Sequence, residues 1–281
     1  MAPRHRRSDG ACRPYPRDHD SCGRTHPSQN RSLLRRRHPF GGDRGTSNVS
    51  AILAVDTSRF ATSLAVTRAG SPPTVFAPQG PRVHPPKDEI FLVVQALLER
   101  SGCALADLDA LAVCVGPGSF TGLRIGLAMT KTFAMVGRLP LYALDAVSLE
   151  ARRVARILGT DLPPRFCVVV PGYGSVTFSG LFTAAEGKLE LEGDIRWHGD
   201  PEELAASIPE GLTRFVSSES PLDLENAVPV VFTEPSALEL ARHAGERLEA
   251  AVDVPLNRIQ PLYLKPFGVG RKARRPEDFR S

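Results

Sequence analysis

The chain has 281 residues, of which 42% are hydrophobic and 23% are charged, and its formal net charge is +4. This length allows one two-lobed domain or two small domains with ample core. The uncharged run at residues 166–185 contains Pro171 and three glycines, so no membrane-spanning helix of roughly 20 apolar residues is expected. The five cysteines are odd in number and form no Cys-x-x-Cys pair, which favours a reducing, cytoplasmic compartment over a disulfide-built secreted domain.

The basic charge lies at the two ends of the chain. Residues 1–48 contain eleven arginines and four aspartates, whereas the rest of the chain has a small acidic excess. This leader has no apolar periodicity and no signal-peptide core, so we expect it to be disordered. The alternatives are a mitochondrial transit peptide and a translation start near Val49, which would leave the leader unmade. A second basic stretch, at residues 271–275, indicates nucleic-acid contact only in an unspecific way.

The ordered part is predicted to begin with a β-hairpin. Residues 51–55 and 61–67 read as strands, and residues 56–59 form a polar tip between them. Asp56 ends a buried strand, where its carboxylate could hold a hydrated magnesium ion while Thr57 and Ser58 donate to phosphate oxygens. The alternative is that these three residues only close a turn.

A glycine motif at residues 116–126, Gly-Pro-Gly-Ser-Phe-Thr-Gly-Leu-Arg-Ile-Gly, follows a predicted buried strand at 111–115. A phosphate-binding P-loop needs a lysine after its glycines, and this motif has none. A dinucleotide fingerprint needs glycine where Thr121 stands, and a serine nucleophile elbow needs glycines in place of Pro117 and Thr121. The motif therefore matches none of these three ligand-binding loops.

Two predicted helices, at residues 88–100 and 119–136, are apolar on nearly all sides. A helix that only covers its own sheet needs one apolar stripe, so the pattern predicts that a second protein covers the rest. Small residues at four-residue spacing in the second helix form a ridge that another helix could approach closely. The alternative is a thick core within the chain itself. The ridge consists of Gly122, Gly126, Thr130 and Ala134.

The second half of the chain reads as ordinary α/β structure. We expect strands at residues 166–170, 176–182 and 228–232, and helices at 202–208 and 235–251. The seven histidines include no pair four residues apart and no pairing with cysteines, so no metal site is expected from them.

Three segments together resemble one family closely. Ala54-Val55-Asp56-Thr57-Ser58, the apolar helix at 88–100 and the glycine motif are similar to the TsaB (YeaZ) family, and Pro261-Leu262-Tyr263-Leu264-Lys265 resembles a further segment of it. The resemblance implies an α/β fold of the actin/Hsp70/sugar-kinase (ASKHA) type with two ribonuclease-H-like lobes. After the leader, the lobes are expected at residues 49–147 and 148–281, the second being divergent and ending in the basic tail.

The resemblance also implies a function. Such proteins are non-catalytic partners of the transferase TsaD, acting with the ATPase TsaE in placing threonylcarbamoyl on the adenosine beside the tRNA anticodon, and they form homodimers when isolated. The chain alone would bind no cofactor; ATP and magnesium would act only in the partner complex, tRNA would be met only through that complex, and no membrane is involved. The expected interface residues, on the two apolar helices, are Ile90, Phe91, Val94, Leu97, Gly122, Arg124, Gly126, Thr130 and Ala134.

The predicted second lobe departs from the family pattern. Residues 170–177 read Val-Pro-Gly-Tyr-Gly-Ser-Val-Thr where the family usually has Asp-Ala-Arg-x-Gly-Glu-Val-Tyr, and residues 213–219 lack a glycine pair that would let the backbone approach an adenine. A nucleotide-using enzyme of this fold needs a second carboxylate from that hairpin, so Asp56 would stand alone. The alternatives to a non-catalytic partner are an ATP-dependent phosphotransferase and a peptidase-like protein acting on its partner. TsaD itself is expected to carry a metal-binding His-x-x-x-His, which this chain lacks.

Overall fold

The computed structural model describes residues 51–59, 62–77, 89–172, 176–217, 227–247 and 255–264. The leader at 1–48, the basic stretch at 271–275 and the hairpin tip at 173–175 lie outside the described residues, so the predictions for them stay predictions. Every helix among the described residues is too short or too polar to cross a bilayer.

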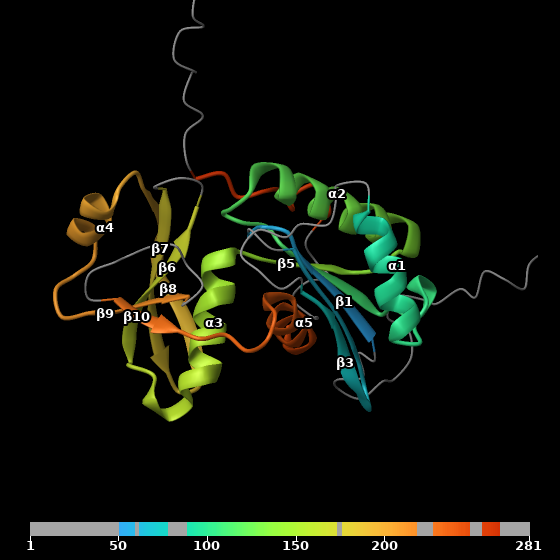
Figure 1. Ribbon diagram of the computed structural model, residues 1–281, viewed down its shortest axis with the longest axis horizontal. Coiled ribbons are helices and arrows are strands. Elements are labelled where there is room, and N and C mark those ends of the chain that lie inside the picture. The colour runs from blue at the N-terminus through green and yellow to red at the C-terminus, as the bar shows by residue number, and fades with distance from the viewer. Residues whose placement is uncertain are drawn as a thin grey trace, which may run out of the picture. The chain divides into compact units, whose positions relative to one another are not determined.

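The first sheet has five strands in the spatial order β3-β2-β1-β4-β5 (Figure 1). The central strands β1 and β4 are buried along their whole length, as continuous apolar runs covered on both faces should be. The edge strand β3 is exposed and contains Pro72 and Pro73, residues that block further strand pairing. The strands are β1 (Ala51–Asp56), β2 (Ser63–Arg68), β3 (Ser71–Phe76), β4 (Ala110–Cys114) and β5 (Leu141–Leu144).

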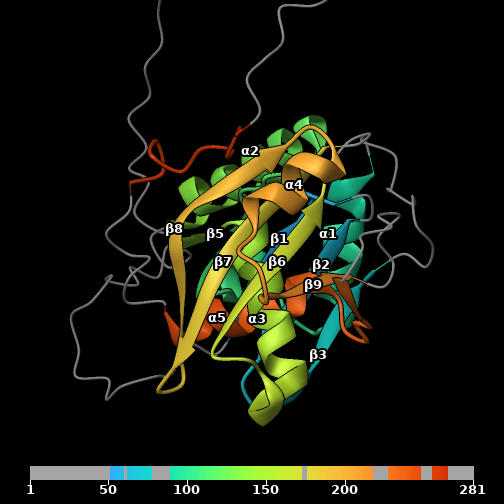
Figure 2. The same ribbon diagram turned by 90° about the vertical axis from the view of Figure 1, so that its left-hand side faces the viewer.

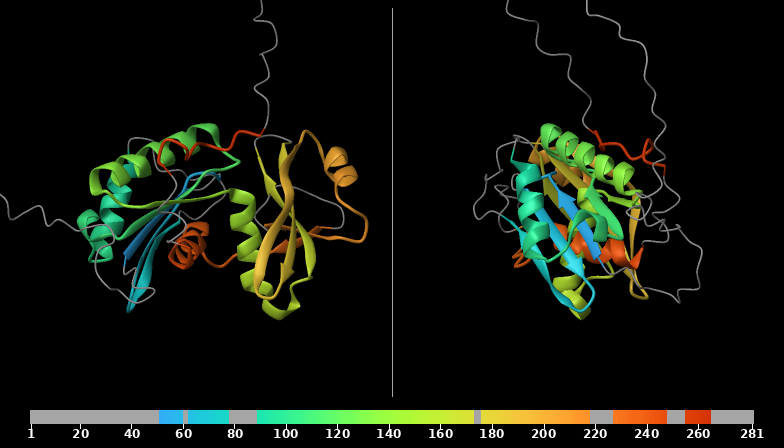
Figure 3. Two further views of the ribbon diagram at one scale, coloured as in Figure 1. Left: turned by 180° about the vertical axis from the view of Figure 1, so that it is seen from behind. Right: turned by 90° about the vertical axis from the view of Figure 1, so that its right-hand side faces the viewer.

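Helices cover both faces of this sheet. Because side chains alternate along a strand, Leu53 and Val55 of β1 point into one core, with α1 (Ile90–Arg100) and α2 (Phe120–Gly137). Ile52 and Ala54 point into the opposite core, which α5 (Ser236–Glu246) covers. Figure 3 shows α2 running along one side of the sheet and α5 along the other. A short 3-10 turn, η1 (Leu105–Asp107), precedes β4.

The second sheet has the order β10-β9-β6-β7-β8 and is covered by α3 on its inner face and α4 on its outer face (Figure 2). Stacked phenylalanines, Phe166 and Phe182, fill the core under α3. The elements are α3 (Ala146–Leu158), η2 (Gly159–Asp161), β6 (Arg165–Pro171), β7 (Thr177–Ala185), β8 (Lys188–His198), α4 (Pro201–Ser207), β9 (Thr213–Ser217) and β10 (Ala227–Val230).

The two sheets repeat one topology. In each, the first strand pairs antiparallel with the second and parallel with the fourth, and the third and fifth strands lie at the edges. This repeat confirms the prediction of two lobes with a ribonuclease-H-like strand order. Helices α3 and α5 contact each other and lie between the two sheets (Figure 1).

The predicted division at residues 148–281 is wrong for the end of the chain. Helix α5 packs on β1, β2 and β4 of the first sheet, and Ile259 is buried in the core beneath α1 and α2. The chain therefore crosses to the second sheet at Asp145 and returns to the first after β10. The returning segment contributes α5 and Ile259 to the two cores of the first lobe.

The helix starts are set by side-chain caps that the sequence supplies. Ser119 accepts a hydrogen bond from the Gly122 amide at the start of α2, and Asp145 accepts one from the Ser148 amide at the start of α3. Helix α2 ends where Arg138 adopts a left-handed conformation, at φ 52°. The predicted helix at 119–136 is thus confirmed to within one residue at each end.

The core beneath α5 gives a direct test of the fold. Leu240 is fully buried against the first sheet, so Leu240→Ala should lower the free energy of unfolding by about 2–5 kcal/mol. Leu92→Ala, at a position that is mainly exposed, should change it by less than about 0.5 kcal/mol. Urea unfolding of both variants measures the difference, and equal losses would contradict the packing of α5.

Candidate functional site

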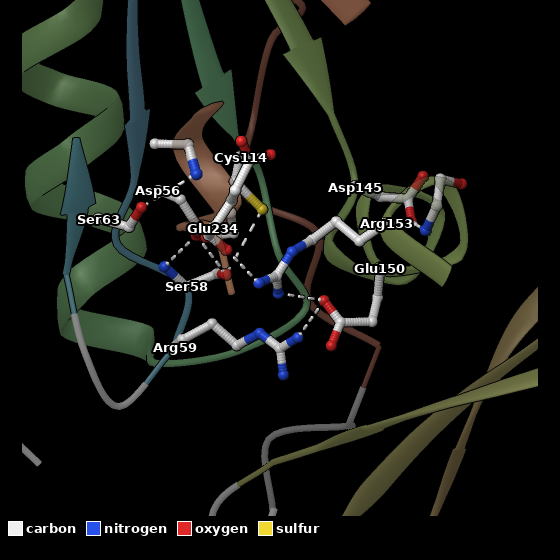
Figure 4. Close-up of polar contacts among 12 residues, drawn as sticks. Asp56, Ser58, Arg59, Ser63, Cys114, Asp145, Glu150, Arg153 and Glu234 are labelled. Carbon is white, nitrogen blue, oxygen red and sulfur yellow. Dashed lines mark hydrogen bonds and ion pairs between the residues drawn. The ribbon is translucent and has the colours of Figure 1, made fainter. Parts of the chain in front are cut away.

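The polar turn at residues 56–59 begins with the last residue of β1 and contacts α3 and α5. Asp56 ends β1 with only 1% of its surface exposed. Its Oδ1 accepts from the Ser58 amide at 2.9 Å and from the Ser58 hydroxyl at 2.6 Å, and its Oδ2 accepts from Ser236 at the start of α5 (Figure 4). A helix N-terminus stabilises a nearby carboxylate, so Asp56 holds α5 on the first sheet.

The other two residues predicted to bind phosphate are buried in the same turn. The Thr57 hydroxyl is buried against Gly126 of α2 and has no hydrogen-bond partner, while the Ser58 hydroxyl is used by Asp56 and accepts from Cys114 Sγ at 3.4 Å. Both side chains are at most 3% exposed. In this arrangement both side chains take part in a closed turn, which agrees with the alternative, and their contact with phosphate stays a prediction.

The same contacts bear on the predicted magnesium site. Both oxygens of Asp56 already accept hydrogen bonds from hydroxyl groups of the chain, and the described residues contain no cluster of three His, Cys, Asp or Glu side chains that could hold a metal ion. Protein-bound magnesium usually keeps several waters and uses one or two carboxylates, so a hydrated ion at Asp56 stays a prediction.

Helix α2 and the loop before it pack directly on the turn through glycines. A Cβ atom added at Gly118 would lie 2.1 Å from the Ser58 carbonyl oxygen, one at Gly122 would lie 2.2 Å from the Thr57 carbonyl oxygen, and one at Gly126 would lie 2.2 Å from Thr57 Oγ1. These distances are shorter than any real contact, so only glycine permits the approach. The Ser119 amide also donates to the Ser58 carbonyl at 2.7 Å. The glycines of the motif therefore allow the hairpin turn at residues 56–59 to pack closely against it, and we call this packing the glycine seat.

This seat corrects the prediction that the small-residue ridge meets a partner helix. Gly126, Thr130 and Ala134 are buried within the chain, and Thr130 donates its hydroxyl hydrogen bond to the Gly126 carbonyl at 2.9 Å. Gly122 lies against the turn. The ridge faces inward because the turn needs the space that small side chains leave.

The predicted interface residues of α1 divide in the same way. Ile90, Val94 and Leu97 are each at most 3% exposed and belong to the core, whereas Phe91 is 53% exposed. On α2, Arg124 is exposed as well. Of the nine residues predicted for an interface, only Phe91 and Arg124 lie plainly at the surface.

An apolar surface is nevertheless present at neighbouring positions. Leu92, Met135 and Val136 are 62%, 69% and 77% exposed, and with Phe91 they form what we call the exposed apolar face. The Phe91 ring contacts the Phe133 ring edge-on, with centroids 6.1 Å apart, so α1 and α2 lie side by side here. The sequence pattern showed that the helices were too apolar for one core but did not show which residues face outward.

The C-terminal segment returns to the start of α2. The Leu262 amide donates to the Val115 carbonyl at 2.8 Å, and the Tyr263 hydroxyl accepts from Arg124 Nε at 3.1 Å. The Arg124 guanidinium also lies 3.8 Å above the Phe120 ring. These contacts give the Pro-x-Tyr-Leu segment a structural role: it fastens the end of the chain to the glycine motif.

A buried ion cluster joins the turn to α3. Arg59 Nη2 lies 2.6 Å from Glu150 Oε2, and Arg153 Nη1 lies 2.9 Å from the same oxygen (Figure 4). Burial alone would raise the pKa of the Glu150 carboxyl, but the two arginines hold it below its ordinary value. Arg153 continues to the Glu234 carbonyl at 2.7 Å, in the segment that leads back to α5. No sequence signal marked this cluster, because isolated charges do not reveal their partners.

The altered hairpin of the second lobe is described only in part. The Gly172 amide donates to the Val176 carbonyl at 2.8 Å, which closes the hairpin, while residues 173–175 lie outside the described residues. Further along β7, Ser179 Oγ lies 2.8 Å from His198 Nε2. Both residues are buried, and burial lowers the pKa of His198, so this pair holds β7 and β8 together with a neutral imidazole.

Comparisons with known proteins agree with this geometry. Residues 87–173 match the family model described as "TsaD: tRNA N6-adenosine threonylcarbamoyltransferase". The chain is 38% identical over 101 residues to the tRNA threonylcarbamoyladenosine biosynthesis protein TsaB of Escherichia coli, covering 36% of this chain and 42% of that one. It is 27% identical over 139 residues to TsaB of Bacillus subtilis, covering 50% of this chain and 58% of that one.

A solved structure extends the match to both lobes. YeaZ from Pseudomonas aeruginosa superposes with a TM-score of 0.59 at 25% identity, covering 76% of this chain and all of that one. Together these comparisons support assignment to the TsaB/YeaZ family. The fold of the chain is accordingly the actin/Hsp70/sugar-kinase type that the resemblance implied. The sequence matches span less than two thirds of the two curated TsaB proteins.

The close packing of Gly126 on Thr57 can be tested by a double-mutant cycle. Gly126→Ala should lower the free energy of unfolding by about 1–3 kcal/mol through overpacking, although alanine is the better helix former by about 1 kcal/mol. Thr57→Ala removes the atoms at 2.2 and 3.2 Å and leaves only the Thr57 Cβ at 3.3 Å, so the double variant should recover most of the loss. Urea unfolding measures all four proteins. A stable Gly126→Ala single variant would show that the turn does not sit under α2.

The buried His198 predicts a pH dependence of stability. Its folded-state pKa lies below its ordinary value, so the unfolded state takes up more protons as the pH falls from about 7.5 to about 5.5, and stability is lost in that window. His198→Gln can still hydrogen-bond Ser179 and does not titrate, so its unfolding free energy should fall less over the same range. Equal slopes for the two proteins would contradict a neutral, buried His198.

Proposed function

We propose that this chain is a non-catalytic docking partner of a TsaD-type transferase in tRNA threonylcarbamoyladenosine biosynthesis. The pathway is proposed from the similarity to two TsaB proteins and from the match to the TsaD family model. The docking role rests on one structural observation, the exposed apolar face at the paired helices α1 and α2.

The exposed apolar face is what a docking surface requires. Its four large side chains are each more than half exposed, and three of them are aliphatic or thioether groups with no polar atom that water could hydrate strongly. Monomeric proteins rarely leave contiguous apolar patches of this kind uncovered. In the isolated protein a second copy can cover the face, and in the assembly the transferase takes that place.

The polar turn supports a non-catalytic role. An ATP-using protein of this fold needs a free carboxylate at the end of β1 for its metal. Here the Asp56 carboxylate accepts hydrogen bonds from Ser58 and Ser236, and the Thr57 hydroxyl is packed under α2. These residues thus pack against α2, which we call the docking helix, and against the start of α5. We assign ATP and magnesium to the partner complex.

The remaining parts of the assembly follow from the same proposal. A TsaE-type ATPase joins the pair, and tRNA is met through the complex. The three described cysteines, Cys103, Cys114 and Cys167, are all buried and free, which fits a cytoplasmic location for such a complex.

A charge placed on the exposed apolar face tests the proposal. Met135→Glu should weaken binding to the TsaD-type protein of the same organism by at least about tenfold, because a desolvated carboxylate opposes burial of the face. Co-purification and calorimetry measure the change. The variant should fold normally, since Met135 is 69% exposed.

The matched control is Ile157→Glu on α3, where an aliphatic residue is 49% exposed but lies away from α1 and α2. It should keep wild-type affinity and restore growth to a cell deficient in TsaB, whereas Met135→Glu should not. A Met135→Glu protein that still co-purifies with the transferase and complements the cell would refute docking through this face.

A further inference from the structure

The turn at residues 56–59 touches the docking helix on one side and the second lobe on the other. On the first side, Thr57 and Ser58 lie under Gly118, Gly122 and Gly126, at distances that no other residue type would permit. The Ser119 amide adds a 2.7 Å hydrogen bond to the Ser58 carbonyl. The first two turns of α2 therefore follow any shift of this turn, because no space separates the two backbones.

On the second side, Arg59 ties the same turn to α3. Its guanidinium reaches Glu150, which is 1% exposed and also holds Arg153. A further link joins the start of α3 to the glycine motif, where the Ala146 amide donates to the Gly116 carbonyl at 2.6 Å. Glu150 on α3 therefore holds Arg59, and the turn that contains Arg59 packs against the start of α2.

We propose that Arg59 and Glu150 are positioning residues for the docking helix, so that breaking their ion pair weakens partner binding although neither residue belongs to the exposed apolar face. The expected loss of partner binding rests on the proposed docking function. The inference also makes a claim about the isolated chain, namely that the pair holds the start of α2 in place.

The chain supplies a closely matched control in a second ion cluster. Arg156 pairs with Glu239, which is 5% exposed and keeps a second arginine, Arg242, at 3.7 Å. In the same way, Glu150 keeps Arg153 when Arg59 is lost. The second cluster joins α3 to α5, and within the described part of the chain its ion pairs do not include the turn. Arg59→Gln and Arg156→Gln each remove one arginine from a two-arginine cluster, the Arg156 side chain being the more exposed at 46% against 18%, and only the first removes an ion pair made by the turn.

The binding experiment compares these two variants with the wild type. Arg59→Gln should raise the dissociation constant for the TsaD-type protein roughly 3- to 30-fold, the range seen for coupling through packed contacts. Arg156→Gln should change it less than about twofold, and Arg59→Lys, which keeps the charge, should recover part of the loss. Unchanged affinity of a folded Arg59→Gln, or equal losses in the two variants, would overturn the inference.

A second readout needs no partner. Hydrogen exchange of the isolated full-length chain should be faster at residues 118–127 in Arg59→Gln than in the wild type, and unchanged there in Arg156→Gln. If the wild type fails to bind the transferase, the proposed function fails, yet faster exchange at 118–127 would still support the positioning role. Equal exchange in all three proteins would overturn it.

Discussion

The close packing of the 56–59 turn against the glycines of α2 is the contact on which the rest of the structure depends. It requires glycine at positions 118, 122 and 126, because a Cβ atom at any of them would overlap atoms of Ser58 or Thr57. It also brings Asp56 to the start of α5 and Arg59 to Glu150 on α3. One polar turn thereby contacts the start of α2 and both helices that lie between the sheets.

The exposed apolar face consists of residues of α1 and α2 that this packing leaves outside the core. The core takes Val94 and Leu97 from α1 and Leu127 and Met129 from α2, which is enough to cover the first sheet. The apolar residues that remain point outward, and they are too large and too many to be incidental on a helix pair of this length. Under the proposed function, docking would use the side of these two helices that faces away from the core.

Much of the fold could be predicted from the sequence, and the errors have one physical cause. The hairpin, the order of strand, glycine motif and helix, and the two-lobed fold were predicted and are confirmed. A helix that is apolar on all sides has no polar stripe to mark its outer face, so the inward ridge at Gly126 and Thr130 was assigned to the surface. Small residues can admit a partner helix or the chain's own turn equally well. The contact between Asp56 and Ser236, which are 180 residues apart, has no local signal at all.

The central claim, that a TsaD-type transferase docks on the exposed apolar face, is tested most directly by the footprint that the transferase leaves on the full-length chain. Hydrogen exchange of the chain alone and in the complex would map it residue by residue. The account predicts that new protection is concentrated in α1 and along α2, with little change in β8 and α4 of the second lobe. Protection confined to β8 and α4, with α1 and α2 exchanging as they do in the free chain, would contradict it.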